Sequence, residues 1–260
     1  MEFDYSHLIC FSPTHSSHMI GETILRGLGA EHSTETDLTY EEPAERLEIS
    51  QAVTVIVVPV YGGRVAETAL ERMKDIHGDG SPVIPVVVYG NRDYEDALLE
   101  LCDWCVEHGF LPFAAAAFVG EHSYSRFDRP VAAGRPDEDD LLEAMAFGQE
   151  IRSKLKRKKK LNNIPALQVK GNRPYKIKSP KTPQAPLTDK GRCTQCGFCV
   201  EICPVQAIRL EEEIVTDAEL CIKCCACVKQ CPKGAQIFDT PFTDFLFKNF
   251  NARRQPELFY

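Results

Sequence analysis

The feature that most constrains this chain is a cysteine pattern that occurs twice near its C-terminal end. Residues 193–204 and 221–232 each spell C-x2-C-x2-C-x3-C-P, and the two runs align without a gap, 28 residues apart. Thiolates are the soft ligands that iron–sulfur clusters require, and this close spacing lets one loop wrap three corners of a cubane. The pattern therefore predicts two [4Fe–4S] clusters, held by Cys193, Cys196, Cys199, Cys203, Cys221, Cys224, Cys227 and Cys231.

Zinc is the main alternative for paired cysteines. Zinc sites use four ligands, in C-x2-C units separated by a longer loop. Two complete runs that each end in Cys-Pro do not fit that arrangement. Cys102 and Cys105 invite a redox-disulfide interpretation, but both lie on the apolar stripe of a predicted helix and are expected to be core. We expect Cys10 to be core as well, and Cys225 to be a buried thiol rather than a cluster ligand.

The first half of the chain alternates apolar strands with amphipathic helices. Apolar runs of strand length lie at 7–11, 53–58, 83–89 and 111–119, with a further candidate at 30–38. Helical periodicity lies between and after them, at 17–28, 65–76, 93–108 and 137–154. This alternation indicates βαβ units, and β-branched runs are typical of parallel strands buried on both faces. Five strands predict an α/β doubly wound sheet of flavodoxin type.

Charge divides the chain as well. Residues 1–150 carry a net charge of −19 and residues 151–260 one of +11, and the segment 151–181 has 12 Lys or Arg and no acid. We expect a doubly wound domain at 1–155, a basic Pro-containing linker at 156–187, a two-cluster domain at 188–240 and an aromatic-rich tail at 241–260. The linker is expected to dock on the acidic first domain, and the tail to pack on its own domain rather than on a partner. Nucleic acid or an anionic membrane is the alternative partner of a basic run.

Three loops follow the carboxyl ends of predicted strands, where open parallel sheets bind ligands. The loop at 12–17 opens a helix, and its hydroxyl and backbone N–H groups suit a phosphate dianion without any Lys or Arg. The loop at 59–64 offers paired glycines, an aromatic ring and an arginine, and the loop at 89–94 a second ring. The candidate cofactor-binding residues are Ser12, Thr14, His15, Ser16, Ser17, Val60, Tyr61, Gly62, Gly63, Arg64, Gly90, Asn91, Arg92 and Tyr94.

Both halves resemble known families. Residues 188–240 resemble bacterial two-cluster ferredoxins, in which the last cysteine of each run ligates the other cluster. This resemblance implies two crossed ligand sets: Cys193, Cys196 and Cys199 with Cys231, and Cys221, Cys224 and Cys227 with Cys203. The loop at 12–17 resembles the T-x-T-G-x-T phosphate loop of flavodoxins, with His15 where that family has Gly. Histidine tolerates a left-handed backbone better than most residues.

With the stretches GGR (62–64), YGNRDY (89–94) and HSYS (122–125), the chain as a whole resembles the flavodoxin–ferredoxin fusion proteins of anaerobic bacteria and archaea. The resemblance implies FMN in the first domain, with its phosphate held by Ser12, Thr14, Ser16 and Ser17. We also expect Tyr61 or Tyr94 to stack on the flavin ring and Arg64 to pair with charge on it. His122 is expected to approach the flavin or to make a structural hydrogen bond.

A flavin exchanges one or two electrons and each cluster exchanges one. We therefore expect an electron-transfer protein that relays electrons between FMN, two [4Fe–4S] clusters and external redox partner proteins. A flavin-dependent reductase fed by its own clusters is one alternative, and a redox sensor or scaffold with an empty flavin site is another. No catalytic residue is assigned, and the donor, the acceptor and homo-oligomerisation stay open.

The location is expected to be cytoplasmic. The N-terminus, MEFDYSHLICF, lacks the features of a signal peptide, and no apolar run reaches the ~18–20 residues of a membrane helix. We expect neither membrane insertion nor nucleic-acid binding.

Overall fold

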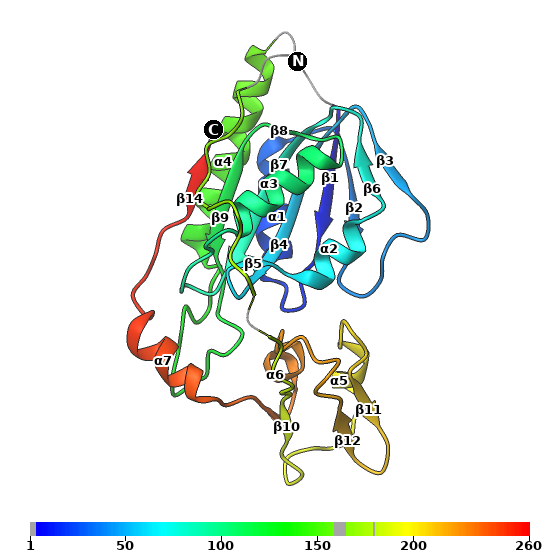
Figure 1. Cartoon of the computed structure of the whole chain (residues 1–260), viewed down its shortest axis with the longest axis vertical. Helices are drawn as coiled ribbons and strands as arrows, with labels where there is room; N and C mark the ends of the chain where they lie inside the picture. The colour runs from blue at the N-terminus through cyan, green and yellow to red at the C-terminus, as the bar shows by residue number, and fades with distance from the viewer. Residues whose placement is uncertain (1–3, 159–164, 179) are drawn as a thin grey trace.

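The computed structural model describes residues 4–158, 165–178 and 180–260. These residues form a larger α/β part built on one sheet and a smaller part with short helices and two two-stranded sheets. Figure 1 shows the smaller part next to the edge of the sheet at which the parallel strands end. The loops predicted to bind a flavin therefore face the part that carries the cysteine repeats.

Five parallel strands form the body of the large sheet. They are β1 (Tyr5–Cys10), β2 (His32–Asp37), β4 (Ala52–Tyr61), β7 (Pro82–Tyr89) and β9 (Ala115–Val119). Their order, β2-β1-β4-β7-β9, is the 2-1-3-4-5 order of flavodoxin-type doubly wound sheets. The predicted fold class is confirmed, and the candidate strand at 30–38 is β2. The strand expected at 111–119 is divided into the short β8 (Leu111–Pro112) and β9.

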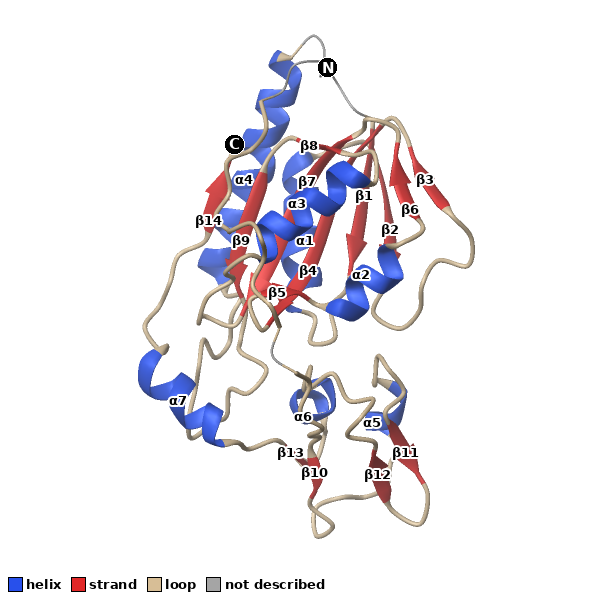
Figure 2. Ribbon diagram, viewed as in Figure 1, coloured by secondary structure: helices blue, strands red, loops and turns tan. Residues whose placement is uncertain are grey.

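Four helices cover the two faces of this sheet. They are α1 (Ser16–Leu28), α2 (Glu67–Met73), α3 (Ala97–Glu107) and α4 (Glu138–Arg157). On β1, Leu8 and Cys10 belong to the core shared with α1 and α4. Ile9, and Phe11 just after the strand, face the core shared with α2 and α3. Figure 2 shows these helices in layers on either side of the sheet. Burial on both faces explains why the central strands are apolar throughout.

Helices α1 and α4 approach closely through a pair of glycines. A Cβ atom at Gly27 would lie 3.0 Å from the Cα of Gly148, so a larger residue at either position forces the helices apart.

A capping box between Asp137 and Asp140 starts α4. The helix continues to Arg157, two residues beyond the expected end of the domain.

Short strands complete the larger part. β3 (Leu47–Ile49) and β6 (Ile76–Gly78) pair in parallel, and β5 (Arg64–Val65) forms a hairpin with the end of β4. β6 begins at the last residue of the helix expected at 65–76, so α2 is shorter than the periodicity indicated.

The smaller part contains the cysteine repeats. Its elements are β10 (Leu187–Thr188), α5 (Phe198–Glu201), β11 (Ile208–Leu210), β12 (Ile214–Thr216), α6 (Ala226–Gln230) and β13 (Gln236–Ile237). β10 pairs with β13 and β11 pairs with β12, both antiparallel. The second pair is the hairpin expected between the repeats.

The 28-residue repeat also appears in the backbone. Three positions in each repeat have a positive φ, and the members of each pair are related by the repeat: Gln195 and Lys223, Gly197 and Cys225, Gln206 and Gly234. The two halves of the small part therefore have the same local chain path, as the gap-free alignment predicts.

The C-terminal tail does not remain on the domain that precedes it. After α7 (Pro241–Asn249), the chain returns to the larger part, where β14 (Glu257–Phe259) pairs antiparallel with β9. The expectation that the tail packs on its own domain is therefore wrong. Only three residues pair with the sheet, and such a short strand has no readable alternation in sequence.

The linker lies against the acidic domain over residues 165–178. Lys170 Nζ is 2.8 Å from a carboxylate oxygen of Asp93, and Arg173 Nη2 is 2.5 Å from Asp103. Leu167 and Val169 pack against the core that contains α2 and α3. The docking hypothesis is confirmed for these residues, whereas Lys159 and Lys160 of the basic run lie outside the described residues.

A buried carboxylate orders the middle of this linker. Asp96 accepts hydrogen bonds from the backbone N–H groups of Asn172, at 2.8 Å, and Lys176, at 2.6 Å. Burial alone would raise the pKa of Asp96, but these hydrogen bonds lower it below its ordinary value. The helix predicted at 93–108 starts as α3 only at Ala97, because residues 93–96 form a turn that holds the linker.

Candidate iron–sulfur and flavin sites

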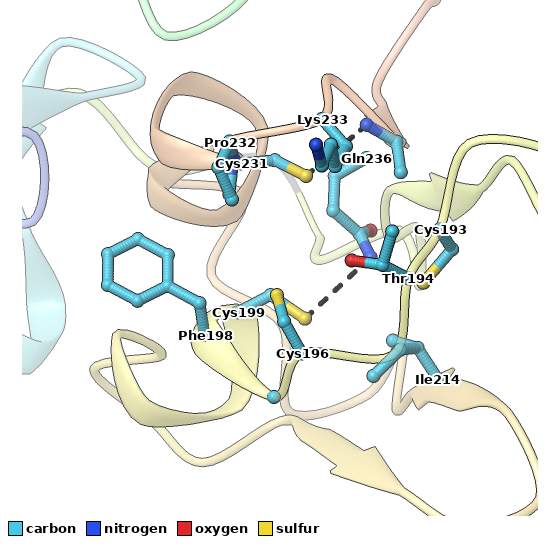
Figure 3. A pocket seen from close by; sticks show the side chains of 12 residues that line it. Cys193, Thr194, Cys196, Phe198, Cys199, Ile214, Cys231, Pro232, Lys233 and Gln236 are labelled. Carbon is cyan, nitrogen blue, oxygen red and sulfur yellow. Dashed lines mark hydrogen bonds between the residues drawn. The ribbon is translucent and has the colours of Figure 1, made fainter.

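Four cysteines from both repeats line one cavity, which we call the outer site. Cys193, Cys196 and Cys199 come from the first repeat, and Cys231 ends the second. Figure 3 shows the four side chains around this cavity, with Gln236 beside them. Cys196 is exposed, and Cys199 is buried. The structure thus brings together one of the two crossed sets.

The other crossed set forms what we call the inner site, made of Cys203, Cys221, Cys224 and Cys227. Burial raises the pKa of Cys224 to about 12, and the neighbouring thiol of Cys203 contributes to this rise. Three of its four cysteines are buried, whereas only one of the outer four is. Neighbouring buried thiols stay deprotonated only with a cation, which coordinated iron supplies.

The outer-site cysteines line a cavity between the two repeats. In a cubane each thiolate binds a different iron, so four cysteines surround a space instead of meeting at a point. Four thiolates around one cavity therefore fit a [4Fe–4S] cluster.

Backbone N–H groups donate to the cysteine sulfurs in both repeats. Gln195 donates to Cys193 and Lys223 to Cys221, each at 3.4 Å. Ala207 donates to Cys203 at 3.2 Å and Ala235 to Cys231 at 3.3 Å. The members of each pair are 28 residues apart. Such donors stabilise the negative charge that a cluster places on its thiolate ligands.

The remaining four cysteines belong to neither crossed set. Cys225 is 1% exposed and has a φ of 60°, matching the φ of 79° at Gly197 in the first repeat. Cys10, Cys102 and Cys105 are also buried. All four are buried, as expected, and the expectation that none of them is a cluster ligand stays a prediction.

The first predicted flavin loop, residues 12–17, has groups available for a phosphate. His15 has a φ of 64°, the left-handed conformation expected where flavodoxins have glycine. Ser12 Oγ accepts from the backbone N–H of His18 at 3.0 Å and fixes the loop on the start of α1. No hydrogen bond involves the hydroxyls of Thr14, Ser16 or Ser17 among the described residues. Free hydroxyls at a helix N-terminus fit a phosphate group.

The second loop, residues 59–64, fits a flavin only in part. Gly62 and Gly63 have φ values of 65° and 84°, so both need a glycine backbone. Arg64 is held by other protein groups, because its guanidinium lies 2.5 Å from Glu100 and over the ring of Tyr175. It also donates to the linker, at the carbonyl of residue 176. The expected contact of Arg64 with a flavin is corrected to a linker anchor.

The third loop, residues 89–94, holds the tail. Asn91 is 1% exposed, and its Nδ2 donates to the carbonyls of Phe250, at 2.6 Å, and Ala252, at 2.8 Å. Tyr94 is fully buried and its hydroxyl donates to Glu257 at 2.6 Å. A ring in this position cannot stack on a ligand at the sheet edge, so the flavin roles expected for Asn91 and Tyr94 are corrected.

The other members of the third loop also contact protein groups. Arg92 forms an ion pair with Glu95 at 2.6 Å. A Cβ atom at Gly90 would collide with the ring of His122. Burial lowers the pKa of His122 to about 4, and its Nδ1 accepts from the backbone N–H of Tyr124 at 3.0 Å. His122 therefore makes the structural hydrogen bond, which was one of its two expected roles.

Tyr61, at the end of β4, contacts the inner site. Together with Ile222, it packs against a small cluster formed by Ile202, Cys224 and Ala226. Burial raises the pKa of Tyr61, and the thiols of Cys224 and Cys225 raise it further. The ring expected on the flavin thus also lies beside Cys224, a candidate ligand of the inner site.

Further contacts hold the two parts together at this edge. Gln230, at the end of α6, donates from Nε2 to the carbonyl of Pro13 at 3.0 Å, and its Oε1 lies 3.4 Å from His15 Nε2. Arg72 donates to the carbonyl of Pro204 at 2.6 Å. The phosphate loop and the inner-site loop therefore touch the same interface.

An ion pair also holds the two parts together. Lys229 Nζ is 2.5 Å from Glu121 Oε1 and donates to the carbonyl of Ser125 at 2.7 Å. Sequence reasoning did not find Lys229 or Gln230. They lie between two cluster cysteines, and no spacing rule marks a residue that contacts a loop more than 100 positions away.

Comparison with known proteins gives one family match and several similar solved structures. Residues 192–235 match the family model of the 4Fe-4S dicluster domain. No curated protein matches the chain. Among solved structures, a flavodoxin from the domain Archaea is 13% identical with a TM-score of 0.40, covering 59% of this chain and 99% of its own. A Streptococcus pneumoniae flavodoxin is 15% identical with a TM-score of 0.42, covering 58% and 99%.

A Giardia intestinalis flavodiiron protein is 12% identical with a TM-score of 0.37, covering 58% of this chain and 36% of its own. TM-scores this low carry no argument, so the fold of the larger part rests on its strand order. The chain joins a flavodoxin-like domain to a dicluster iron–sulfur domain. This pairing supports a role in electron transfer. In the described parts of the chain, no helix has the length and apolar character needed to cross a bilayer.

Proposed function

We propose that this chain is an electron-transfer protein that relays electrons between FMN in the flavodoxin-like domain, two [4Fe–4S] clusters and external redox partners. The observation that carries the proposal is the contact of Tyr61 with the small cluster that contains Cys224. Tyr61 ends the strand whose loop was expected to meet a flavin, and Cys224 belongs to the inner site. One side chain thus connects the candidate flavin edge to a candidate cluster.

FMN supplies chemistry that accepts or releases one or two electrons, whereas each cluster exchanges one. The residues that would hold its phosphate are Ser12, Thr14, Ser16 and Ser17, whose hydroxyls and helix N-terminus form an anion site without a cation. The backbone at Gly62 and Gly63 allows close approach, and Tyr61 provides an aromatic ring beside them. Arg64, Asn91 and Tyr94 are left out of this site, because the linker and the tail occupy them.

The two cluster sites have different surroundings. The inner site lies against the flavodoxin-like domain, with three buried cysteines. The outer site has an exposed ligand, Cys196, at the protein surface. This supports an order in which external one-electron carriers meet the outer cluster and the inner cluster exchanges with the flavin. The ferredoxin-like domain also covers part of the sheet edge, which favours a relay over reduction of a small substrate there.

Anaerobic purification of the full chain tests the proposal. We expect about eight iron and about eight sulfide per chain, as two [4Fe–4S] clusters require, and one FMN released on denaturation. Fewer than about seven iron would count against two clusters. Clusters without extractable flavin, and without uptake of added FMN, would reject the relay and favour a sensor or scaffold. A Ser16→Asp variant should lose FMN and keep its iron, since it places a carboxylate in the phosphate loop.

A further inference from the structure

The repeat relates the two cluster sites, but the two strand pairs beside them carry different side chains at one equivalent position. The 28-residue offset relates Thr188 to Thr216 and Ile208 to Gln236. In the structure Thr188 pairs with Gln236 across β10 and β13, and Thr216 pairs with Ile208 across β11 and β12. Equivalent positions of two similar strand pairs therefore hold an amide near one site and an aliphatic side chain near the other.

Gln236 points its amide at the outer site. Its Nε2 is 3.0 Å from Thr188 Oγ1, and the residue is 3% exposed. The same Nε2 is 3.9 Å from the Sγ of Cys199, which Figure 3 shows beside Gln236. Its Oε1 has no partner among the described residues. A thiolate sulfur accepts hydrogen bonds and repels an amide oxygen, so a bound cluster favours this orientation of the amide.

The inner site has no such donor at the equivalent place. Ile208 is buried in a hydrophobic cluster that contains Cys227, the counterpart of Cys199, together with Cys199 itself. The hydroxyl of Thr216, the counterpart of Thr188, is buried without a hydrogen-bond partner in the described parts of the chain. The hydrogen-bonded pair of Gln236 and Thr188 near the outer site is thus replaced by an aliphatic side chain, Ile208, at the equivalent place near the inner site.

The side-chain donor and the greater exposure of the outer site both raise the reduction potential of its cluster relative to that of the inner cluster. Reduction adds a negative charge to a cluster, and hydrogen bonds to its sulfurs and exposure to water stabilise that charge. The outer site has the side-chain donor and the exposed ligand Cys196, whereas the inner site has neither at the matching positions, since Cys224 is buried.

We propose that Gln236 is a positioning residue that, with the exposure of the outer site, makes the outer cluster the higher-potential one, so that it is reduced first. This deepens the proposed function and rests on the part of it that assigns two clusters. It does not depend on FMN. The repeat supplies two equivalent cluster sites, and a single position in each strand pair makes them different.

The test is an anaerobic redox titration of the full-length protein with dithionite, followed by electron paramagnetic resonance, in which each cluster takes up one electron. The wild-type protein should show two separate one-electron steps. A soluble paramagnetic relaxing agent should affect the first-reduced signal more strongly, because the outer site is exposed. Iron content identifies any variant that has lost a cluster.

Three variants complete the test. Methionine has a length similar to that of glutamine but no N–H donor, so Gln236→Met should move only the first step to lower potential. The shift should be up to about tenfold in the reduced-to-oxidised ratio of the outer cluster, which is ~59 mV for one electron. Ile208→Gln, which places an amide near Cys227 and Thr216, should move only the second step upward. The double exchange, Ile208→Gln with Gln236→Ile, should bring the two steps closer or reverse them.

Some results would overturn the inference while leaving the clusters in place. These are unchanged midpoints in Gln236→Met, equal shifts of both steps, or a first-reduced signal that the relaxing agent does not reach. A wild-type protein without two clusters would instead reject the proposed function itself, so the two failures are distinguishable. If one variant loses iron, the other single variant still tests the same asymmetry.

Discussion

Replacing Asn91 by Asp tests whether the third loop binds the tail and not a flavin. The two side chains have nearly the same shape, and both tolerate the left-handed φ of 63° found here. The change removes the two N–H groups that hold the carbonyls of Phe250 and Ala252, and it places an acceptor where the donor lay. The tail should therefore detach more often.

The size of the effect follows from these contacts. Each hydrogen bond contributes about 1 kcal/mol, so losing both costs about 2 kcal/mol, or about a 30-fold increase in the open population. Hydrogen exchange monitored by mass spectrometry should show this increase for residues 250–259, where β14 pairs with β9. The effect should be the same in FMN-free protein. Arg92→Gln, the neighbouring change at a more exposed ion pair, is the control.

One result would refute this account of Asn91. If Asn91→Asp left exchange in β14 unchanged while weakening FMN binding at least tenfold, the side chain would belong to a flavin site. The observed hydrogen bonds to the tail would then contribute nothing to holding β14 on the sheet.

Three further predictions follow from single contacts. Cys203→Ser should damage the cluster held by the second repeat while the outer cluster remains, seen as loss of one resonance signal and about half the iron. Loss of the outer cluster instead would contradict the crossed sets. Lys229→Met should raise exchange in the loop at 12–17 about fivefold, as loss of ~1 kcal/mol of docking implies, and high salt should mimic it in the wild type only. Gly27→Ala should lower the unfolding free energy by about 2 kcal/mol in urea titrations, since its Cβ would press on α4, whereas Met19→Ala, at an exposed position of α1, should change it little.

The sheet and the cysteine sites were predictable because their signals are local. A β-branched run such as 53–58 specifies a strand buried on both faces, and the repeat places equivalent cysteines in equivalent loops. The left-handed conformation of His15 was also predictable, because it follows from the loop alone. In each case the physical cause lies within about a dozen residues of sequence.

The misassigned residues share a different cause. Arg64, Asn91 and Tyr94 lie in loops that resemble flavin loops, but their partners come from the linker and the tail. Asn91 and Phe250 are 159 positions apart, and the strand that returns to the sheet has only three residues. Where a side chain has several chemically suitable partners, the fold decides which of them it contacts. Sequence alone did not show that the chain returns to its first domain.

The central claim is that the flavin and the clusters exchange electrons within one chain. Flash photoreduction of the flavin in the purified, anaerobic holoprotein tests it most directly, with flavin and cluster absorbance followed in time. We expect flavin reoxidation to match cluster reduction, with a rate constant that does not change over a tenfold range of protein concentration. A rate proportional to protein concentration, or reduced flavin that persists beside oxidised clusters, would contradict the relay.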